Sequence, residues 1–428
     1  MGTYMLKRMA LIFSGLIVVL LLAVACGDDE EEGGTATPRA QQFDGVIKIG
    51  VIGDLSGPIG GNPNLTSPIK GLEVGVQDIN AAGGVRVGGK RYQFQVVKLD
   101  SRSEAVAANA AATQLVQEGV LGSAIVTCAF FQQAYEVIKA SGNIISWTNC
   151  PPGLNLLDKD VPAQFQGIER NPLLFASIDF TLPIIAGWFK QVKQIDPSIR
   201  SVAWMGDDTP LGRAQAAVVP AAAQQAGLEF RGPPVHFPFG TTDMSPFLTD
   251  LRGRGADIVY MSHGGNLDAP RQFLQLGVAP RVMIPGLRPF DLTRIGDVGS
   301  ATVVMLDWRL PYHKEVAPPD YQDEVAKLGT LEGGAAIQIG FATAYYDFMR
   351  LLKDAIEKAG TFTDAKAVAN ALVGLRTESL MGGQVRVDPD HAVRGPAGLI
   401  VTTREKFVVY SYPDATTDRA SNVFEVRR

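Results

Sequence analysis

The feature that most constrains the fold is an alternation of two hydrophobic patterns along the chain. From Val46 onward, short apolar runs rich in β-branched residues alternate with longer segments whose apolar residues recur at helical spacing. Residues 46–52 (VIKIGVI) predict the first strand, residues 67–82 predict the first helix, and Gly83 and Gly84 end that helix. Strands that alternate with such helices favour parallel sheets built from βαβ units. The chain is therefore predicted to be an α/β protein with doubly wound, Rossmann-like lobes.

The alternation occurs twice, which predicts two lobes. A turn-rich stretch at 151–162 is followed by a second series of strands and helices with the same rhythm. The roughly 385 residues after the N-terminal segment also exceed what one hydrophobic core usually organises. A C-terminal tail of different character can cross back to complete both lobes, and three crossings would form a hinge. The predicted organisation is an N-terminal lobe of residues 44–166 plus about 300–385 and a C-terminal lobe of residues 167–299 plus about 386–428.

The N-terminal segment has the layout of an export signal. Lys7 and Arg8 precede a mostly apolar run at 9–25, and Cys26 follows directly. The small residues before Cys26 resemble the site at which bacterial lipoproteins are cleaved and acylated, so residues 1–26 are predicted to be a lipoprotein signal peptide with Cys26 as the lipidation site. The alternative is an uncleaved membrane anchor of about 17 apolar residues, which is short for a spanning helix. Both alternatives place the bulk of the chain outside the membrane, in the cell envelope.

Residues 27–43 are predicted to form a flexible tether. The segment opens with two aspartates and three glutamates and continues with glycine, threonine and proline, so it has almost nothing that could enter a core. A lipid on Cys26 would then hold the folded part at the membrane surface.

Charge and motif content exclude several function classes. The formal net charge is -5 with 19% charged residues, and the lysines and arginines are scattered, so nucleic-acid binding is not predicted. Ser56 lies outside a G-x-S-x-G motif, and no glycine-rich nucleotide-binding motif follows the first strand. The histidines lie far apart and lack metal-ligand spacing: His236, His263, His313 and His391. The sequence thus predicts a protein that is not an enzyme, with no catalytic residue, no cofactor and no metal site.

Two cysteines remain once Cys26 is assigned to the signal. Cys128 and Cys150 each follow a predicted strand. In an exported protein such a pair can form a disulfide, which would brace two neighbouring loops. Strand order decides whether their Cα atoms come within about 7 Å, so the sequence leaves the pairing open.

Three stretches resemble a known family. Residues 49–58 (IGVIGDLSGP) and 75–84 (GVQDINAAGG) are the most specific, and residues 202–212 (VAWMGDDTPLG) support them. On these residues the chain resembles the type I periplasmic binding proteins of the leucine/isoleucine/valine-binding branch. The resemblance implies a monomer that closes two lobes over an amino acid, an amide or an aromatic acid and delivers it to an ABC permease. A protein that senses such a ligand and reports to a membrane receptor is the alternative, because both roles use one ligand-shifted closure.

The candidate ligand-binding residues follow predicted strands. In doubly wound sheets, ligands bind outside the carboxyl ends of the strands, near helix N-termini whose free N–H groups favour anions. The residues at these positions are Ser56, Cys128, Ala129, Phe130, Phe131, Trp147, Thr148 and Asn149 on the first lobe, and Asp208, Leu211, His263, Gly264, Leu287 and Arg288 on the second lobe.

Several of these residues depart from the pattern of the amino-acid-binding relatives. Ala129, Phe130 and Phe131 stand where those relatives have a serine-rich run. Leu287 and Arg288 stand where they place an acid for the ligand ammonium. A zwitterionic amino acid would here lose a charge-assisted hydrogen bond worth about 1.5 to 3 kcal/mol. The sequence therefore favours a carboxylated or otherwise apolar-bodied ligand, with Arg288 meeting an anionic group.

Two alternatives stay open at this site. Phe130, Phe131 and Trp147 predict an aromatic slot for the ligand, but Phe131 and Trp147 also fit the core of the lobe. Asp208 and the neighbouring Asp207 would suit a cationic or hydroxylated ligand, whereas an aspartate before Thr-Pro also fits a helix N-cap.

Overall fold

A computed structural model describes most of the chain from residue 42 onward. Within the described ranges, no helix is both long and apolar enough to cross a membrane. The predicted signal peptide with Cys26, and nearly all of the predicted tether, lie outside these ranges. The described residues are 42–57, 60–149, 171–176, 182–208, 210–238, 241–262, 272, 275–278, 280–285, 302–307, 326–329, 337, 339–380, 383–389, 391–395, 397–402, 406–412, 420 and 422–427.

The first sheet has, in the described part of the chain, six strands in the order β2-β3-β1-β4-β5-β6. All neighbouring pairs are parallel except β2 with β3. The chain runs from β1 to β3 on one side and then to β4 on the other, so the topological switch point lies beside β1. The strands are β1 (Gly45–Gly53), β2 (Val85–Val87), β3 (Lys90–Asp100), β4 (Gly122–Ile125), β5 (Ile145–Thr148) and β6 (Leu174–Ala176).

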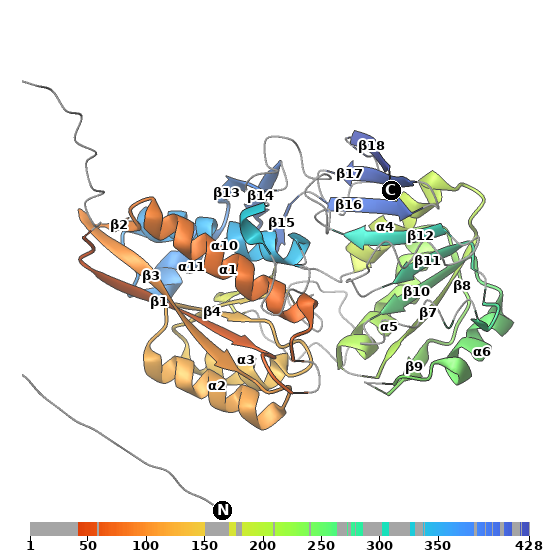
Figure 1. The fold of residues 1–428 in the computed structure, drawn as a ribbon, viewed down its shortest axis with the longest axis horizontal. Helices are drawn as coiled ribbons and strands as arrows, with labels where there is room; N and C mark the ends of the chain where they lie inside the picture. Colours follow the sequence, from red (N-terminus) through yellow and green to blue (C-terminus); the bar gives the residue numbers. More distant parts are fainter. Residues whose placement is uncertain are drawn as a thin grey trace, which may run out of the picture. The chain divides into compact units, whose positions relative to one another are not determined.

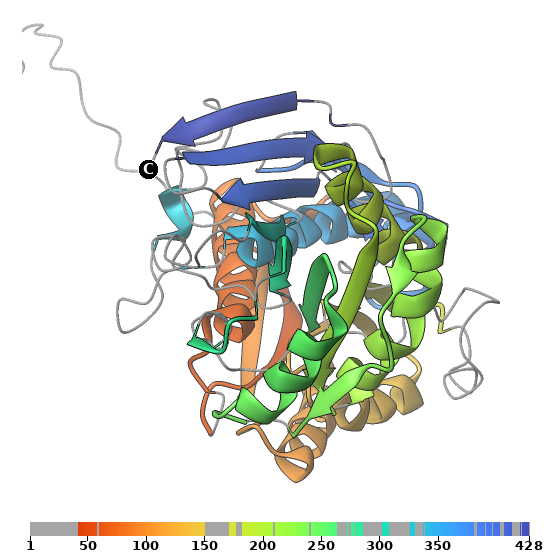
Figure 2. The ribbon, with the colours of Figure 1, turned by 90° about the vertical axis from the view of Figure 1, so that its right-hand side faces the viewer.

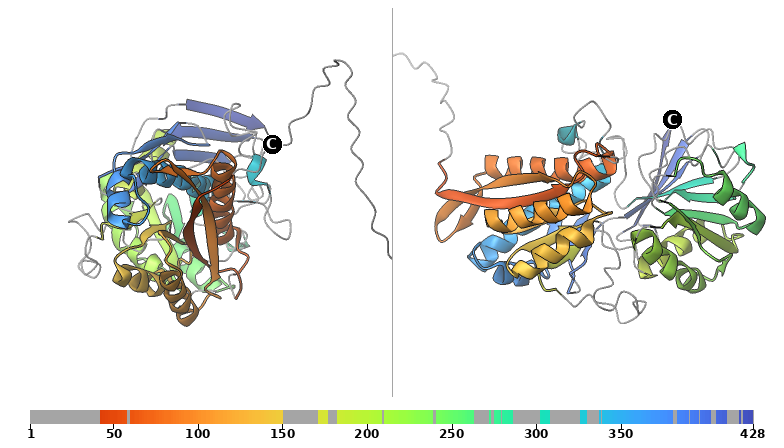
Figure 3. Two further views of the ribbon diagram at one scale, coloured as in Figure 1. Left: turned by 90° about the vertical axis from the view of Figure 1, so that its left-hand side faces the viewer. Right: turned by 90° about the horizontal axis from the view of Figure 1, so that it is seen from below.

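Helices cover both faces of this sheet (Figure 1). One face carries α1 (Pro63–Ala81), α10 (Ile339–Ala359) and α11 (Ala365–Leu372). The other face carries α2 (Ala105–Glu118) and α3 (Phe131–Ser141), which lie side by side in Figure 3.

Glycine allows α1 and α10 to touch. A Cβ atom on Gly71 would lie 1.8 Å from the carbonyl oxygen of Ala342, a distance at which two atoms overlap. Only glycine can occupy this crossing, so helix α10 packs directly on the first helix of the lobe.

The alternation within β1 explains how one strand serves two cores. Ile47, Ile49 and Val51 point to the cluster shared with α1 and α10, whereas Ile52 points to the cluster shared with α2 and α3. A strand covered on both faces must be apolar on both, which is why residues 46–52 form a nearly continuous apolar run.

A small antiparallel sheet completes this lobe. It comprises β13 (Arg376–Glu378), β14 (Gln384–Val387) and β15 (Val393–Arg394). Val385, Val387 and Val393 are buried in the same cluster as α10 and α11. The small sheet is therefore part of the first lobe.

The second sheet has nine strands within the described residues, in the order β18-β17-β16-β12-β11-β10-β7-β8, with β9 also paired to β7. The strands from β7 to β12 are parallel, and β16, β17 and β18 form an antiparallel extension along one edge (Figure 2). The strands are β7 (Ser201–Asp207), β8 (Glu229–Phe230), β9 (Val235–Phe237), β10 (Ile258–Ser262), β11 (Val282–Pro285), β12 (Thr302–Asp307), β16 (Ala397–Thr402), β17 (Lys406–Tyr412) and β18 (Asn422–Arg427).

Helices α4 (Leu182–Ile195) and α5 (Pro210–Gln225) share the main core of the second sheet. Helix α6 (Ser245–Arg254) packs near β9, where the rings of Phe237 and Phe247 lie 5.9 Å apart. Both sheets thus have the predicted α/β character, with a central strand from which the chain winds in two directions.

In the order of the described elements, the chain passes between the two sheets three times. The crossings lie between β6 and α4, between β12 and α10, and between β15 and β16. Three crossings agree with the predicted hinge, but their positions differ from the predicted boundaries.

Three strands join a different sheet from the one predicted. β6 belongs to the first sheet, although residues 167–299 were assigned to the second lobe. β12 belongs to the second sheet, although residues 300–385 were assigned to the first lobe, and β15 pairs with β14 although residues 386–428 were assigned to the second lobe. The reason is physical: hydrophobic alternation marks a strand but does not identify the strand with which it pairs.

Candidate ligand site

The loops at the carboxyl edge of the first sheet hold most of the predicted first-lobe residues. β1, β4 and β5 are neighbouring parallel strands, so the residues that follow them reach the same edge of the sheet. This edge includes the switch point beside β1, where doubly wound sheets bind ligands.

Asp54 is the most deeply buried acid at this edge. Its Oδ1 accepts hydrogen bonds from Ser101 Oγ at 2.5 Å and from Thr127 Oγ1 at 3.0 Å. Its side chain is fully buried, and among the described residues its Oδ2 has no hydrogen-bond partner. Burial raises the pKa of Asp54, and the hydrogen bonds from Ser101 and Thr127 oppose that rise. Asp54 thus ties together the loops that follow β1, β3 and β4.

Asp100 organises the loop that contains Ser56. Its Oδ1 accepts the backbone N–H groups of Leu55 at 3.0 Å, Ser56 at 3.2 Å and Arg102 at 2.8 Å. Its Oδ2 accepts the Ser56 hydroxyl at 2.6 Å. Burial acts to raise the pKa of Asp100, but these hydrogen bonds outweigh burial and lower the pKa. Ser56 is exposed at this edge, yet its hydroxyl hydrogen points to Asp100.

Thr148 and Asn149 are engaged inside the lobe. Thr148 Oγ1 donates to the carbonyl oxygen of Ile125 at 2.9 Å. Asn149 Oδ1 accepts the hydroxyl of Tyr345 at 2.8 Å, and all three side chains are buried. Burial raises the pKa of Tyr345 well above its ordinary value, so this hydroxyl remains a donor at physiological pH. Thr148 and Asn149 thus make these hydrogen bonds inside the lobe and not at an open surface.

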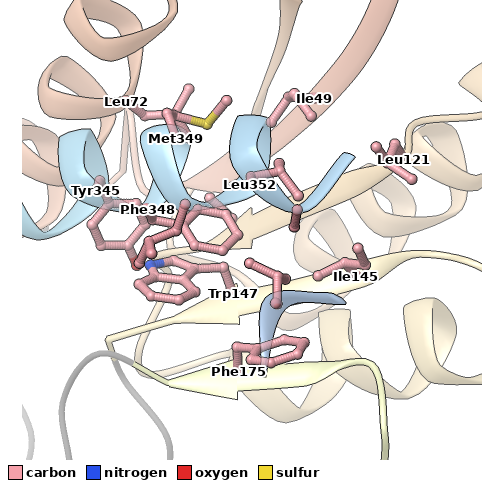
Figure 4. Packing of buried hydrophobic residues seen from close by; sticks show 14 of the residues in the cluster. Ile49, Leu72, Leu121, Ile145, Trp147, Phe175, Tyr345, Phe348, Met349 and Leu352 are labelled. Atoms are coloured by element: carbon pink, nitrogen blue, oxygen red, sulfur yellow. The ribbon is translucent and has the colours of Figure 1, made fainter. Parts of the chain in front are cut away.

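Trp147 and Phe131 lie in the core, which is the alternative that the sequence left open. Trp147 is fully buried and stacks on Phe348 with ring centroids 3.7 Å apart (Figure 4). Phe131 is buried and stacks on Tyr135 with centroids 5.1 Å apart. Phe130 is only half-buried, so of the three predicted aromatic residues it alone presents part of its side chain to solvent.

The N-terminus of α3 lies directly after Phe130. The N-cap side chain provides no capping acceptor to this helix, because it belongs to phenylalanine, which has none. The first N–H groups of a helix have no partner within it and attract negative charge. The edge of the first sheet thus places an uncapped helix N-terminus next to a half-buried aromatic ring.

Cys128, on the loop before α3, is half-buried and takes part in a disulfide bond. Its predicted partner Cys150 lies outside the described residues, so that pairing stays a prediction. The neighbouring Ala129 is half-buried.

The predicted second-lobe residues are described in part. Asp208 is exposed after β7, its N–H donates to the carbonyl oxygen of Phe237, and its own carbonyl accepts Arg213 Nε at 2.9 Å. Leu211 lies in the first turn of α5. The remaining residues lie outside the described part of the chain: His263, Gly264, Leu287 and Arg288.

Several residues of this edge were absent from the predicted site. Asp54 directly follows β1, Asp100 is the last residue of β3 and Ser101 follows it, so a search for polar residues at the end of every predicted strand would have found them. Thr127 likewise follows β4 by two residues. Tyr345 carries no such signal, because it lies in the middle of an amphipathic helix. Among the described residues, no group of three or more His, Cys, Asp or Glu side chains is placed to hold a metal ion.

Comparison with known proteins identifies relatives along nearly the whole chain. A family model described as periplasmic binding protein matches residues 46–403. A Leu/Ile/Val-binding protein homologue from Brucella melitensis is 26% identical over 340 residues, which is 76% of this chain and 83% of that protein.

Solved structures share the fold. A leucine binding protein from Thermotoga maritima has a TM-score of 0.65 at 19% identity, covering 83% of this chain and 95% of its own. A solute binding protein of an ABC transporter from R. palustris, solved in complex with benzoate, has a TM-score of 0.66 at 17% identity, covering 86% of this chain and 96% of its own.

Proposed function

We propose that this chain, which belongs to the periplasmic binding protein family, captures a small carboxylate for an ABC importer by closing its two lobes over the ligand. The family is one of binding proteins and not of enzymes. Two doubly wound sheets joined by three crossings suit this mechanism, because a hinge of that kind converts ligand binding into lobe closure.

The observation that carries the carboxylate assignment is the uncapped N-terminus of α3. Backbone N–H groups at a helix start bind anions without any charged side chain. The other polar side chains of this edge are occupied: Ser56 donates to Asp100, Thr148 to Ile125, and Asn149 accepts from Tyr345. Anion binding by the backbone of α3 would leave all of these hydrogen bonds intact.

The ligands of the two solved relatives point to the same group. One is a leucine binding protein and the other was solved with benzoate, and both ligands carry a carboxylate. The half-buried ring of Phe130 would contact an apolar body next to that carboxylate. Of the acids Asp54 and Asp100 at this edge, Asp54 is fully buried and Asp100 accepts four hydrogen bonds from its own lobe, which disfavours a ligand ammonium there.

The remaining parts of the proposal rest on the sequence. Cys26 would carry a lipid that anchors the protein in the cell envelope. The acidic tether would let the folded part move relative to this anchor, and the protein would bind its permease as a monomer. Arg288 on the second lobe would meet the anion when the lobes close.

Thermal unfolding with matched ligands tests the proposal. Benzoate and benzamide share a ring and differ in charge, so benzoate is expected to raise the melting temperature of the protein and benzamide is not. A ligand at a hundredfold excess over its Kd stabilises the folded state by about 2.7 kcal/mol. Leucine and a polyol complete the series.

Two outcomes would contradict the assignment. Equal stabilisation by benzoate and benzamide would remove the role of the carboxylate, and stabilisation by leucine alone would restore an ammonium site. The variant Phe130→Ala is expected to weaken the benzoate effect about tenfold in Kd, the usual result of losing one aromatic contact of roughly 1.4 kcal/mol.

A further inference from the structure

Two of the three chain crossings leave the first lobe side by side. Ala176 is the last residue of β6 before the crossing to α4, and Arg394 is the last residue of β15 before the crossing to β16. Ala176 forms an isolated parallel bridge with Ala392, and the N–H of Ala176 donates to the carbonyl oxygen of His391 at 3.2 Å. These two exits are thus joined before they reach the second lobe.

His391 holds this junction with its side chain as well as its backbone. Its ring stacks on Phe175 with centroids 4.6 Å apart and planes 3° apart. Its Nδ1 lies 3.2 Å from the carbonyl oxygen of Leu174. Phe175 is fully buried in the main core of the lobe (Figure 4), so the stack connects the exit of β15 to a rigid body.

The backbone at His391 adopts a conformation that few non-glycine residues adopt. Its φ is 65°, in the left-handed region, which glycine occupies most easily and which asparagine, aspartate and histidine enter more often than other residues. Glycine would fit this turn without steric cost. What histidine adds at this position is the ring, with its stack on Phe175 and its contact with the carbonyl oxygen of Leu174.

An ion-pair cluster closes the other side of the turn. Arg386 and Arg394 face each other across β14 and β15, an arrangement that is repulsive on its own. Asp388 bridges them, with its Oδ1 3.0 Å from Arg386 Nε and its Oδ2 2.7 Å from Arg394 Nη1. The N–H of Asp388 also bonds to the carbonyl oxygen of Ala392, and the N–H of His391 to the carbonyl oxygen of Asp388. The turn is therefore rigid on both flanks of His391.

We propose that His391 is a positioning residue of the hinge, which clamps two of the three crossing segments together so that the lobes rotate about one shared line. The inference rests on the proposed closure mechanism and adds to it the residue that restricts the motion. Such a clamp limits the range of lobe orientations in the open protein. Less conformational entropy is then lost when a ligand closes the lobes.

The test measures the arrangement of the lobes without any ligand. Spin labels are attached to Val106→Cys on α2 and Val423→Cys on β18, whose native side chains are 81% and 51% exposed. Double electron–electron resonance then measures the distribution of distances between the two labels. The variants are made in the compact unit of residues 42–428. His391→Gly removes the ring and fits the positive φ, so it is expected to fold and to broaden the distribution.

Three further variants sharpen the test. His391→Asn is a second ringless variant that also tolerates this φ, and it is expected to broaden the distribution as well. His391→Phe keeps the ring and is expected to retain the parent distribution. His236→Ala removes an exposed histidine of β9 and is expected to change nothing.

Hydrogen exchange supplies a second readout. Peptides containing residues 174–176 are expected to exchange about tenfold faster in the ringless variants, because the bond from Ala176 to His391 opens more often. Parent-like distributions in folded His391→Gly and His391→Asn would overturn the proposal. Failure of the proposed function would instead appear as the absence of any ligand-dependent distance change in the parent protein.

Discussion

Tyr345 on α10 donates its hydroxyl to Oδ1 of Asn149 at the end of β5, and the two oxygens lie 2.8 Å apart in the interior of the first lobe. The residues are 196 positions apart in sequence. A helix from the C-terminal part of the chain thereby fixes a loop at the proposed ligand-binding edge of a sheet formed by the N-terminal part. The edge is complete only after the chain has returned from the second lobe.

The variant Tyr345→Phe is expected to lower the free energy of unfolding by about 1 to 3 kcal/mol, because it removes one donor from a buried amide oxygen. Urea unfolding measures the loss. Peptides that contain residues 145–149 should also exchange their amide hydrogens faster.

The neighbouring variant Tyr346→Phe is the matched control. Tyr346 donates to Asp78 Oδ2 at 2.8 Å, so the change removes the same group from the same helix but away from Asn149. Faster exchange of residues 145–149 in both variants would show that Tyr345 has no specific effect on this loop.

Asp54 is expected to make stability fall as pH rises. Burial raises its pKa, so between the unfolded and the folded pKa the folded state holds the proton more tightly, and the free energy of unfolding decreases with pH through that window. Asp54→Asn keeps an acceptor for Ser101 and Thr127 and removes the charge. The variant is expected to be more stable than the parent by roughly 1 kcal/mol at pH 8, and the difference should vanish below about pH 4.

Urea unfolding of both proteins across this pH range checks the expectation. A stability difference that does not change with pH would mean that Asp54 does not titrate differently in the folded state. A large loss of stability at pH 8 would show that the charge itself is required.

The class of the fold was predictable because strands and helices alternate along the chain in both lobes. Strands β1, β4 and β7 are each followed by a helix, a pattern that residues 46–52 and 67–82 already display. Strand partners were not predictable, as β6, β12 and β15 show. The bridge between Ala176 and Ala392 depends on contacts between residues over two hundred positions apart, about which local patterns carry no information.

The candidate site was predictable in position and less so in detail. The rule that ligands lie at the carboxyl ends of strands placed Ser56, Phe130 and Asn149 at one edge. It could not tell which polar groups were already occupied, because the partners of Ser56 and Asn149 are supplied by Asp100 and Tyr345. Nor could it separate Phe130 from Phe131, since the direction of a side chain at a helix start depends on where that helix packs.

The adjacent residues Phe130 and Phe131 are expected to respond differently to truncation. Phe131→Ala removes a buried ring stacked on Tyr135 and should lower the free energy of unfolding by about 3 to 5 kcal/mol. Phe130→Ala removes a half-buried ring and should lower the free energy of unfolding by less than about half of that amount. Urea unfolding of the two variants makes the comparison, and equal losses would contradict the different burial of the two rings.

Asp100 is expected to stabilise the Ser56 loop above acidic pH. Its hydrogen bonds lower its pKa, so its contribution is present above the unfolded pKa of about 4 and is lost as pH falls through the lower folded pKa. Asp100→Asn should reduce the free energy of unfolding by about 1 to 2 kcal/mol at pH 7, with some of the effect screened by solvent, and by little at pH 2.

A double-mutant cycle with Ser56→Ala isolates the contact between these two side chains. The Ser56 hydroxyl and Asp100 Oδ2 are 2.6 Å apart, so the two changes should be non-additive by about 0.5 to 1 kcal/mol at pH 7. If the Ser56 hydroxyl turned towards a ligand instead, the losses of stability in Ser56→Ala and Asp100→Asn would be additive. The main effect of Ser56→Ala would then be a lower affinity for the ligand. Measuring the cycle with and without benzoate separates these results, because a hydroxyl that donates its single hydrogen to Asp100 has none left for a carboxylate.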